Sequence, residues 1–208
     1  EATILALLLG VVLGVVVAVI RTAHDQQRAG HKNVILGVFN AICKIYTTII
    51  RGTPMLLQLY FFFFALPALI PALNKQKFLC IAIALVCNSA AYVSEVIRSG
   101  IQAVDYGQTE AARSVGFSSG EAMRLVVLPQ AIKNILPALG NEFVTVIKES
   151  SIVSVIGIAD LMFRTNDVIA LSYKSLECLA VAALIYFVLT FISSRLVSLA
   201  ERKLSHGK

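Results

Sequence analysis

Long apolar blocks alternate with short polar stretches along this chain. The apolar block Ala2–Ile20 ends at a basic stretch, and blocks of similar length occupy Phe78–Ile97 and Leu179–Val197. An α-helix needs about 20 apolar residues to cross a bilayer. We therefore predict a membrane-spanning helix over each of these three blocks, as spans one, three and five.

A further crossing is predicted between spans one and three. Val34–Ile50 and Met55–Pro71 are both apolar, and Arg51-Gly-Thr-Pro54 separates them. Gly52, Thr53 and Pro54 are expected to break the helix there, because proline removes a backbone donor and glycine weakens helical propensity. We interpret Val34–Ile50 as an approach helix and Met55–Pro71 as span two, ending near residues 66–67.

Span four is predicted over Asn134–Ile147, although Pro137 and Gly140 lead us to expect an irregular helix. The next apolar segment, Ser150–Met162, is too short for a crossing and is typical of a partly inserted segment. The chain is thus predicted to be an all-α membrane protein of about five transmembrane helices, forming one domain over residues 1–208. Because it begins with Glu1 and not Met, we expect a short N-terminal piece to be missing.

Composition agrees with a membrane protein. Hydrophobic residues make up 58% of the chain and charged residues 14%, against about 25% charged in a typical soluble domain. The net charge of +6 is explained by cytoplasmic loops enriched in Lys and Arg. Nucleic acid is therefore not expected as a partner.

The distribution of cations predicts the orientation of the chain, since cytoplasmic loops carry the excess of Lys and Arg. Five spans place one group of cations at the cytoplasmic side: Arg21, Arg28, Lys32, Lys44, Arg51, Arg98, Arg113, Arg124, Lys133, Arg195, Arg202, Lys203 and Lys208. The opposite side receives Lys75, Lys77, Arg164 and Lys174. We therefore expect the N-terminus outside and the C-terminus in the cytoplasm.

The sequence has no signature of catalysis. It contains neither a phosphate-binding G-x-x-x-x-G-K-[ST] loop nor a G-x-S-x-G elbow. Its three histidines lack metal-ligand spacing, and the four cysteines form no CxxC pair. We expect no catalytic residue, no metal site and no cofactor in this chain, so any ATP and Mg²⁺ would be bound by a partner subunit.

The polar interruption between spans three and four carries the most specific motif. It contains Glu110-Ala111-Ala112, then Gly116, then Leu128-Pro129. The small alanines suit close approach to a partner, and Gly116 suits the end of one helix and the start of another. This spacing resembles the cytoplasmic loop of the membrane subunits of binding-protein-dependent ABC importers. The resemblance implies that Glu110, Ala111, Ala112, Gly116, Leu128 and Pro129, in a loop at about residues 106–129, couple the spans to an ATPase.

Other motifs extend the resemblance over nearly the whole chain. Arg51-Gly-Thr-Pro54, Tyr92–Arg98, Gly107–Ala112, Leu128-Pro-Gln130 and Lys148–Ser151 are similar to motifs of the polar amino-acid uptake branch. The resemblance implies a type I importer permease fold in a bacterial cell membrane, in contact with membrane lipid. It also implies an ATP-binding cassette subunit, a second permease subunit that is identical or paralogous, an external solute-binding protein and a polar amino-acid substrate.

Polar residues in or beside the spans are candidates for the substrate path, because such groups are costly in lipid. They are Asn88, Asn141, Glu142, Lys148, Glu149 and Ser150. Charged groups of both signs at Lys148 and Glu149 would suit an amino acid, and equally would hold a broken helix together. Gln58 is favoured as interhelical glue. We interpret Arg51, Glu95 and Arg98 as anchors of helix ends at the cytoplasmic interface.

Two rival functions remain at this stage. A secondary transporter or channel driven by an ion gradient would need no ATPase, but it leaves the Glu110–Pro129 motif unexplained. A non-transporting membrane scaffold or sensor is the other alternative.

Overall fold

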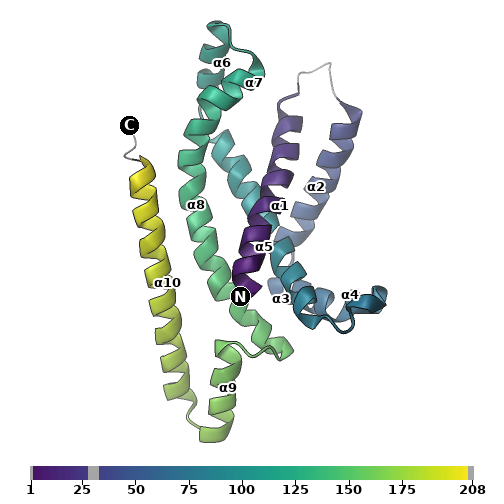
Figure 1. Ribbon diagram of the computed structural model, residues 1–208, viewed down its shortest axis with the longest axis vertical. Coiled ribbons are helices and arrows are strands. Elements are labelled where there is room, and N and C mark those ends of the chain that lie inside the picture. The colour runs from purple at the N-terminus through teal and green to yellow at the C-terminus, as the bar shows by residue number, and fades with distance from the viewer. Residues whose placement is uncertain (1, 28–32, 206–208) are drawn as a thin grey trace.

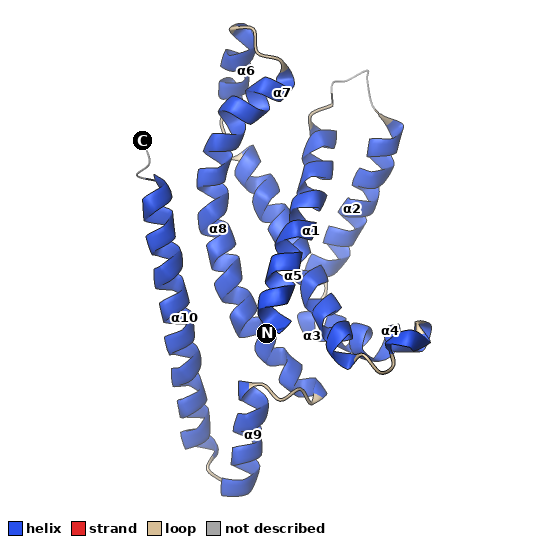
Figure 2. Cartoon of the chain, in the orientation of Figure 1, coloured by secondary structure: helices blue, strands red, loops and turns tan. Residues whose placement is uncertain are grey.

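The computed structural model describes residues 2–27 and 33–205, and all regular structure in these residues is helical (Figures 1 and 2). Its main elements are α1 (Ala2–Asp25), α2 (Val34–Gly52), α3 (Met55–Tyr60), α4 (Leu66–Leu69), α5 (Lys77–Gln102), α6 (Tyr106–Ser114), α7 (Ser119–Ala122), α8 (Leu128–Glu149), α9 (Leu161–Ser172) and α10 (Ser175–Ser205). Residues 1, 28, 32 and 208, used above for the chain start and the orientation, lie outside the described ranges.

Four helices in the described part of the chain are long and apolar enough to cross a membrane: α1, α2, α5 and α10. The 22-residue α8 is also long enough but more polar, since it carries two lysines and two glutamates. In Figure 1, α1, α5 and α10 run toward the end of the molecule that holds α6 and α7, whereas α2 and α8 run away from it. The prediction of an all-α membrane fold with about five crossings is confirmed.

The helices around the second crossing differ from the predicted approach helix and span two. The segment expected as an approach helix is α2, which has the length and hydropathy of a span by itself. The segment expected as span two is broken into α3, a π-helical turn over Phe61–Ala65, and the short α4. Both parts lie along α5: Arg51 contacts Glu95, and Leu59 packs in a cluster with Ile81 and Leu85. The second crossing is therefore assigned to α2, and the shorter apolar segment that begins with α3 follows it after the break.

The expected irregularity of span four is wrong. Pro137 lies inside a continuous α8, where it removes one backbone hydrogen bond without ending the helix. Gly140 is needed for packing, because a Cβ atom there would collide with Val197 of α10. After α8 the chain forms a 3₁₀ helix over Ser150–Ile156 and then turns into α9.

The tightest helix packing joins α1 to α5. A Cβ atom added at Gly10 would lie 2.7 Å from Ser89 Oγ, and one added at Gly14 would lie 2.7 Å from Val93 Cγ1. Glycine at these positions lets the two backbones approach, as small residues do between membrane helices. This contact fixes the register of α1 against α5 and thereby brings their charged ends together.

Candidate functional site

The polar interruption between the third and fourth crossings folds into two short helices, α6 and α7. Asp105 caps α6 by accepting a hydrogen bond from the Gly107 backbone at 2.8 Å. At the other end, the Phe117 N–H donates to Ala112 O and the Gly116 N–H donates to Arg113 O. This pair of bonds is a Schellman motif, which places Gly116 at a φ of 99°. Glycine is favoured there because an L side chain rarely adopts a positive φ.

The second short helix is held by a capping box. Glu121 N–H donates to the Ser118 hydroxyl, and the Glu121 carboxylate accepts from the Ser118 N–H. The backbone hydrogen bond from Ser118 is the main cause of a lowered pKa at Glu121. Arg113 also donates to Ser119 across the turn. These local bonds make the turn between α6 and α7 a defined structure.

One motif residue of this turn is buried, and the other motif residues are exposed to solvent. Ala112 is buried at 5% exposure, where α6 packs against α7 and the following helical turn. Glu110, Ala111 and Gly116 are exposed. Leu128 and Pro129 are exposed as well and begin α8, which follows α7 through a π-helical turn over Met123–Val127. The turn therefore presents an exposed face at the end of the molecule (Figure 1).

The helix break at residues 52–54 is tied to α5 by two buried amides. Gln58 Nε2 donates to Ile50 O at 2.7 Å and to Thr53 O at 3.0 Å. Asn88 Nδ2 donates to Gln58 Oε1 at 3.1 Å, and both side chains are buried. The carbonyls freed by the break thus find donors inside the protein. Gln58 thus has the interhelical bonding role that the sequence favoured for it, and Asn88 shares this role.

The remaining substrate-path candidates lie on the last two turns of α8 and at its end. Glu142 and Glu149 are half-buried and seven residues apart, so they share one face of the helix. Glu142 borders a small cavity of about 160 Å³ that is otherwise lined by apolar residues of α1, α5 and α8. Asn141 and Lys148 are exposed on an adjacent face. The Ser150 hydroxyl donates to Ile147 O at 2.8 Å and helps to end α8.

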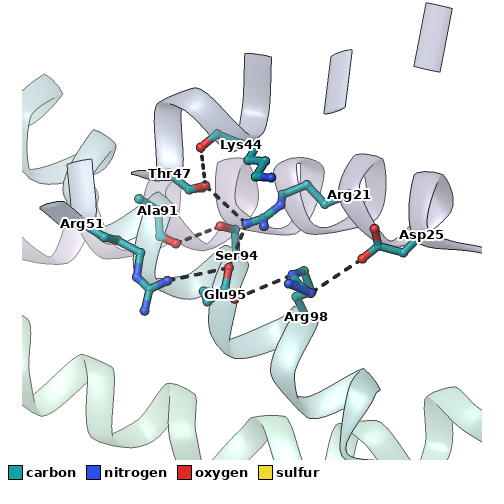
Figure 3. A network of polar contacts seen from close by, with 9 residues as sticks. All are labelled: Arg21, Asp25, Lys44, Thr47, Arg51, Ala91, Ser94, Glu95 and Arg98. Carbon is teal, nitrogen blue, oxygen red and sulfur yellow. Dashed lines mark hydrogen bonds and ion pairs between the residues drawn. The ribbon is translucent and has the colours of Figure 1, made fainter. Parts of the chain in front are cut away.

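A charged cluster joins α1, α2 and α5 (Figure 3). The Glu95 carboxylate lies 2.7 Å from Arg21 and within 3.8 Å of Arg51 and 3.6 Å of Arg98. Arg98 also lies 3.6 Å from Asp25. Arg21 donates a second hydrogen bond to Thr47 Oγ1 at 3.3 Å. One carboxylate thus holds three helices together close to the end of α1.

Comparison with known proteins decides the family. Residues 10–206 match the family described as the inner membrane component of binding-protein-dependent transport systems. The chain belongs to this family. It is a permease component and a multi-pass bacterial membrane protein, as the motif at Glu110–Pro129 predicted.

Relatives of the permease include permease proteins named for arginine transport and for nopaline transport. It is 45% identical over 183 residues to the arginine transport system permease protein ArtQ of Bacillus subtilis, covering 82% of this chain and 83% of ArtQ. It is 36% identical over 205 residues to the nopaline transport system permease protein NocM of Agrobacterium fabrum, covering 95% and 80%.

Solved structures agree with the fold of the permease. The crystal structure of an amino acid ABC transporter with histidines matches with a TM-score of 0.84 at 44% identity, covering 97% of this chain and 88% of that one. The inward-facing MetNI methionine ABC transporter matches with a TM-score of 0.72, covering 98% and 91%. Its 15% identity shows the fold alone. The type I importer permease fold is therefore confirmed.

Sequence reasoning missed the partner of Glu95. Arg51, Glu95 and Arg98 were expected to anchor helix ends, but Arg21 was counted only among the cations of the cytoplasmic side. Arg21 belongs to α1, and its side chain is only 11% exposed. A usable signal was present, because a charged side chain next to an apolar span of this permease needs a partner of opposite sign.

Proposed function

We propose that this permease forms the translocation path of an ATP-driven importer for polar amino acids. The observation that carries the proposal is the match to an amino acid ABC transporter at 44% identity and a TM-score of 0.84. The relatives named for arginine and nopaline transport support the same substrate class. The complete importer would contain a separate ATPase subunit that binds ATP and Mg²⁺, a second permease subunit and a solute-binding protein.

The turn between α6 and α7 is the proposed contact with the ATPase. Its exposed residues Glu110, Ala111 and Gly116 would face the ATPase, while buried Ala112 holds α6 on α7 and Leu128-Pro129 begin the helix that returns to the membrane. Closure of the ATPase pair on ATP would move this turn, and the spans would follow. The local caps at both helices support this role, since a force can be passed only through an ordered contact.

The orientation follows from the same proposal. The α6–α7 end would be cytoplasmic, which puts the start of α1 outside and the end of α10 inside. Cationic side chains of the described residues gather toward that end, in agreement with the usual excess of Lys and Arg on the cytoplasmic side. They include Arg21, Arg98, Arg113, Arg124, Lys133, Arg195 and Arg202, whereas Lys44 lies in the middle of α2 and Arg51 in its last turn, away from that end.

Glu142 and Glu149 are the proposed substrate carboxylates, with Asn141, Lys148 and Ser150 beside them. We expect Glu149→Gln to change the transport affinity, or the preference between cationic and neutral amino acids, by at least about tenfold, because a hydrogen bond to a charged group is worth about 1.5–3 kcal/mol. Transport of radiolabelled arginine and glutamine into proteoliposomes measures both quantities.

Glu177→Gln is the matched control for this variant, since it removes an exposed carboxylate from the first turn of α10. It should transport both amino acids as the wild type does. If Glu149→Gln does the same, Glu149 is structural and does not contact the substrate.

The whole proposal is tested by adding the cognate ATPase and solute-binding protein to the permease in proteoliposomes. We expect ATP hydrolysis to rise when the amino acid is present on the binding-protein side. Uptake that proceeds without ATP and follows an imposed ion gradient would instead identify a secondary transporter. Hydrolysis that ignores both the ligand and changes in the α6–α7 turn would refute the coupling role.

A further inference from the structure

A polar pocket opens between α1, α2 and α5. It has a volume of about 420 Å³, and more of its lining is polar than apolar. Its charged residues are Arg21, Lys44, Arg51 and Glu95, and Thr48 contributes a hydroxyl. We call it the basic pocket.

The charges of the basic pocket do not balance. Three cations line it, and Glu95 is its only carboxylate among the described residues. The Glu95 carboxylate makes its closest contact with Arg21, at 2.7 Å, and lies 3.8 Å from Arg51. Arg98, which lies outside the pocket, also contacts this carboxylate. The ammonium of Lys44 has no ion-pair partner in the described part of the chain. The pocket therefore has room and positive charge for an anion.

The free donors suit a tetrahedral oxyanion. Lys44 and Thr48 are four residues apart on α2, so one helix face presents an ammonium and a hydroxyl together. Arg51 follows on the same face, and its guanidinium stacks on the Tyr92 ring with 5.6 Å between Cζ and the ring centroid. A guanidinium held in one plane binds phosphate through paired N–H groups, and an ammonium adds a point charge.

The surroundings of the pocket indicate an amphiphile. On the same turns of α2, Ile42, Ile45 and Ile49 are 56–60% exposed. Such apolar side chains beside a basic pocket offer a surface for an acyl chain next to a site for a charged headgroup. Basic pockets between membrane helices bind anionic lipid headgroups in this way. We propose that the basic pocket binds the phosphate of an anionic phospholipid, whose acyl chain lies on the isoleucines of α2.

The test uses the complete importer, purified in detergent and supplied with phosphatidylglycerol or with phosphatidylcholine of the same acyl chains. Native mass spectrometry counts the bound lipid, and a melting curve reports the effect on stability. We expect phosphatidylglycerol to bind about tenfold more tightly and to raise the melting temperature. Lys44→Gln and Thr48→Val should each weaken this preference severalfold, because both side chains are exposed donors without a role in holding the helices.

Lys174→Gln is the control, since it removes the same charge from the turn between α9 and α10. It should keep the wild-type preference for phosphatidylglycerol. Equal binding of the two lipids, or an unchanged preference in both pocket variants, would overturn the proposal. Displacement of the lipid by millimolar inorganic phosphate would identify a site for free anions instead. Displacement by arginine or glutamine would assign the pocket to the carboxylate of the substrate.

Discussion

Replacing Gly116 by valine should lower amino-acid transport at least about tenfold, while the permease still reaches the membrane and the ATPase still hydrolyses ATP. The physical reason lies in the backbone. Gly116 has a φ of 99°, and a Cβ atom there would meet nothing within 4 Å. The cost is therefore conformational and amounts to about 1–3 kcal/mol for an L residue held in such a region. We expect the chain to relieve it by opening the Schellman motif, which changes the angle between α6 and α7.

Gly120→Val is the matched control, because Gly120 lies four residues further along the same turn, also in open space, and has no positive φ. It should keep transport and hydrolysis coupled. The measurement is the number of amino acids transported per ATP hydrolysed in proteoliposomes. A Gly116→Val permease with the wild-type ratio would show that the geometry of this turn does not couple the two activities.

Glu95→Gln is expected to produce the largest loss of stability. The substitution removes the only carboxylate within ion-pair distance of Arg21 among the described residues, and the Arg21 side chain is only 11% exposed. Breaking a buried ion pair by removing one partner costs about 3–5 kcal/mol, because the other charge stays uncompensated. We expect the lower end of that range, since the Glu95 side chain is 23% exposed. The melting temperature of the purified permease measures the effect.

Two further variants test whether the loss of stability comes from the unpaired charge of Arg21 or from the loss of any carboxylate. Glu177→Gln should leave the melting temperature close to that of the wild type, because Glu177 is exposed. The double variant Arg21→Gln, Glu95→Gln should melt higher than Glu95→Gln alone, since neither charge is then left without a partner. If the melting temperature of Glu95→Gln equals that of Glu177→Gln, the charged cluster does not stabilise the fold.

The crossings that could be predicted are those whose length is set by the bilayer. Spans one, three and five correspond to α1, α5 and α10, which extend them by a few residues at one or both ends. The bilayer imposes this result, because an uninterrupted apolar run near 20 residues has no other stable arrangement in lipid. The caps around Gly116 were also predictable, since Ser118 and Glu121 form a local sequence pattern.

The features that could not be predicted depend on contacts between distant segments. Pro137 and Gly140 suggested a broken helix, but α8 is continuous, and Gly140 lies where α8 packs closely against Val197 of α10. Arg21 and Glu95 are 74 positions apart, and they meet only because Gly10 and Gly14 let α1 lie on α5 in one register. No pattern within a single segment contains that information. The role of Glu142 and Glu149 stays a prediction for the same reason.

The passage from α7 into α8 has a mechanical consequence. Helical turns follow one another without a loop from Ser119 to Glu149, with the π-helical turn as the one change of pitch between them. At about 1.5 Å per residue, this rod is roughly 45 Å long, and a tilt of about 10° around its middle displaces each end by roughly 4 Å. Under the proposed coupling, a displacement of the α6–α7 turn would therefore move Glu149 in the opposite direction.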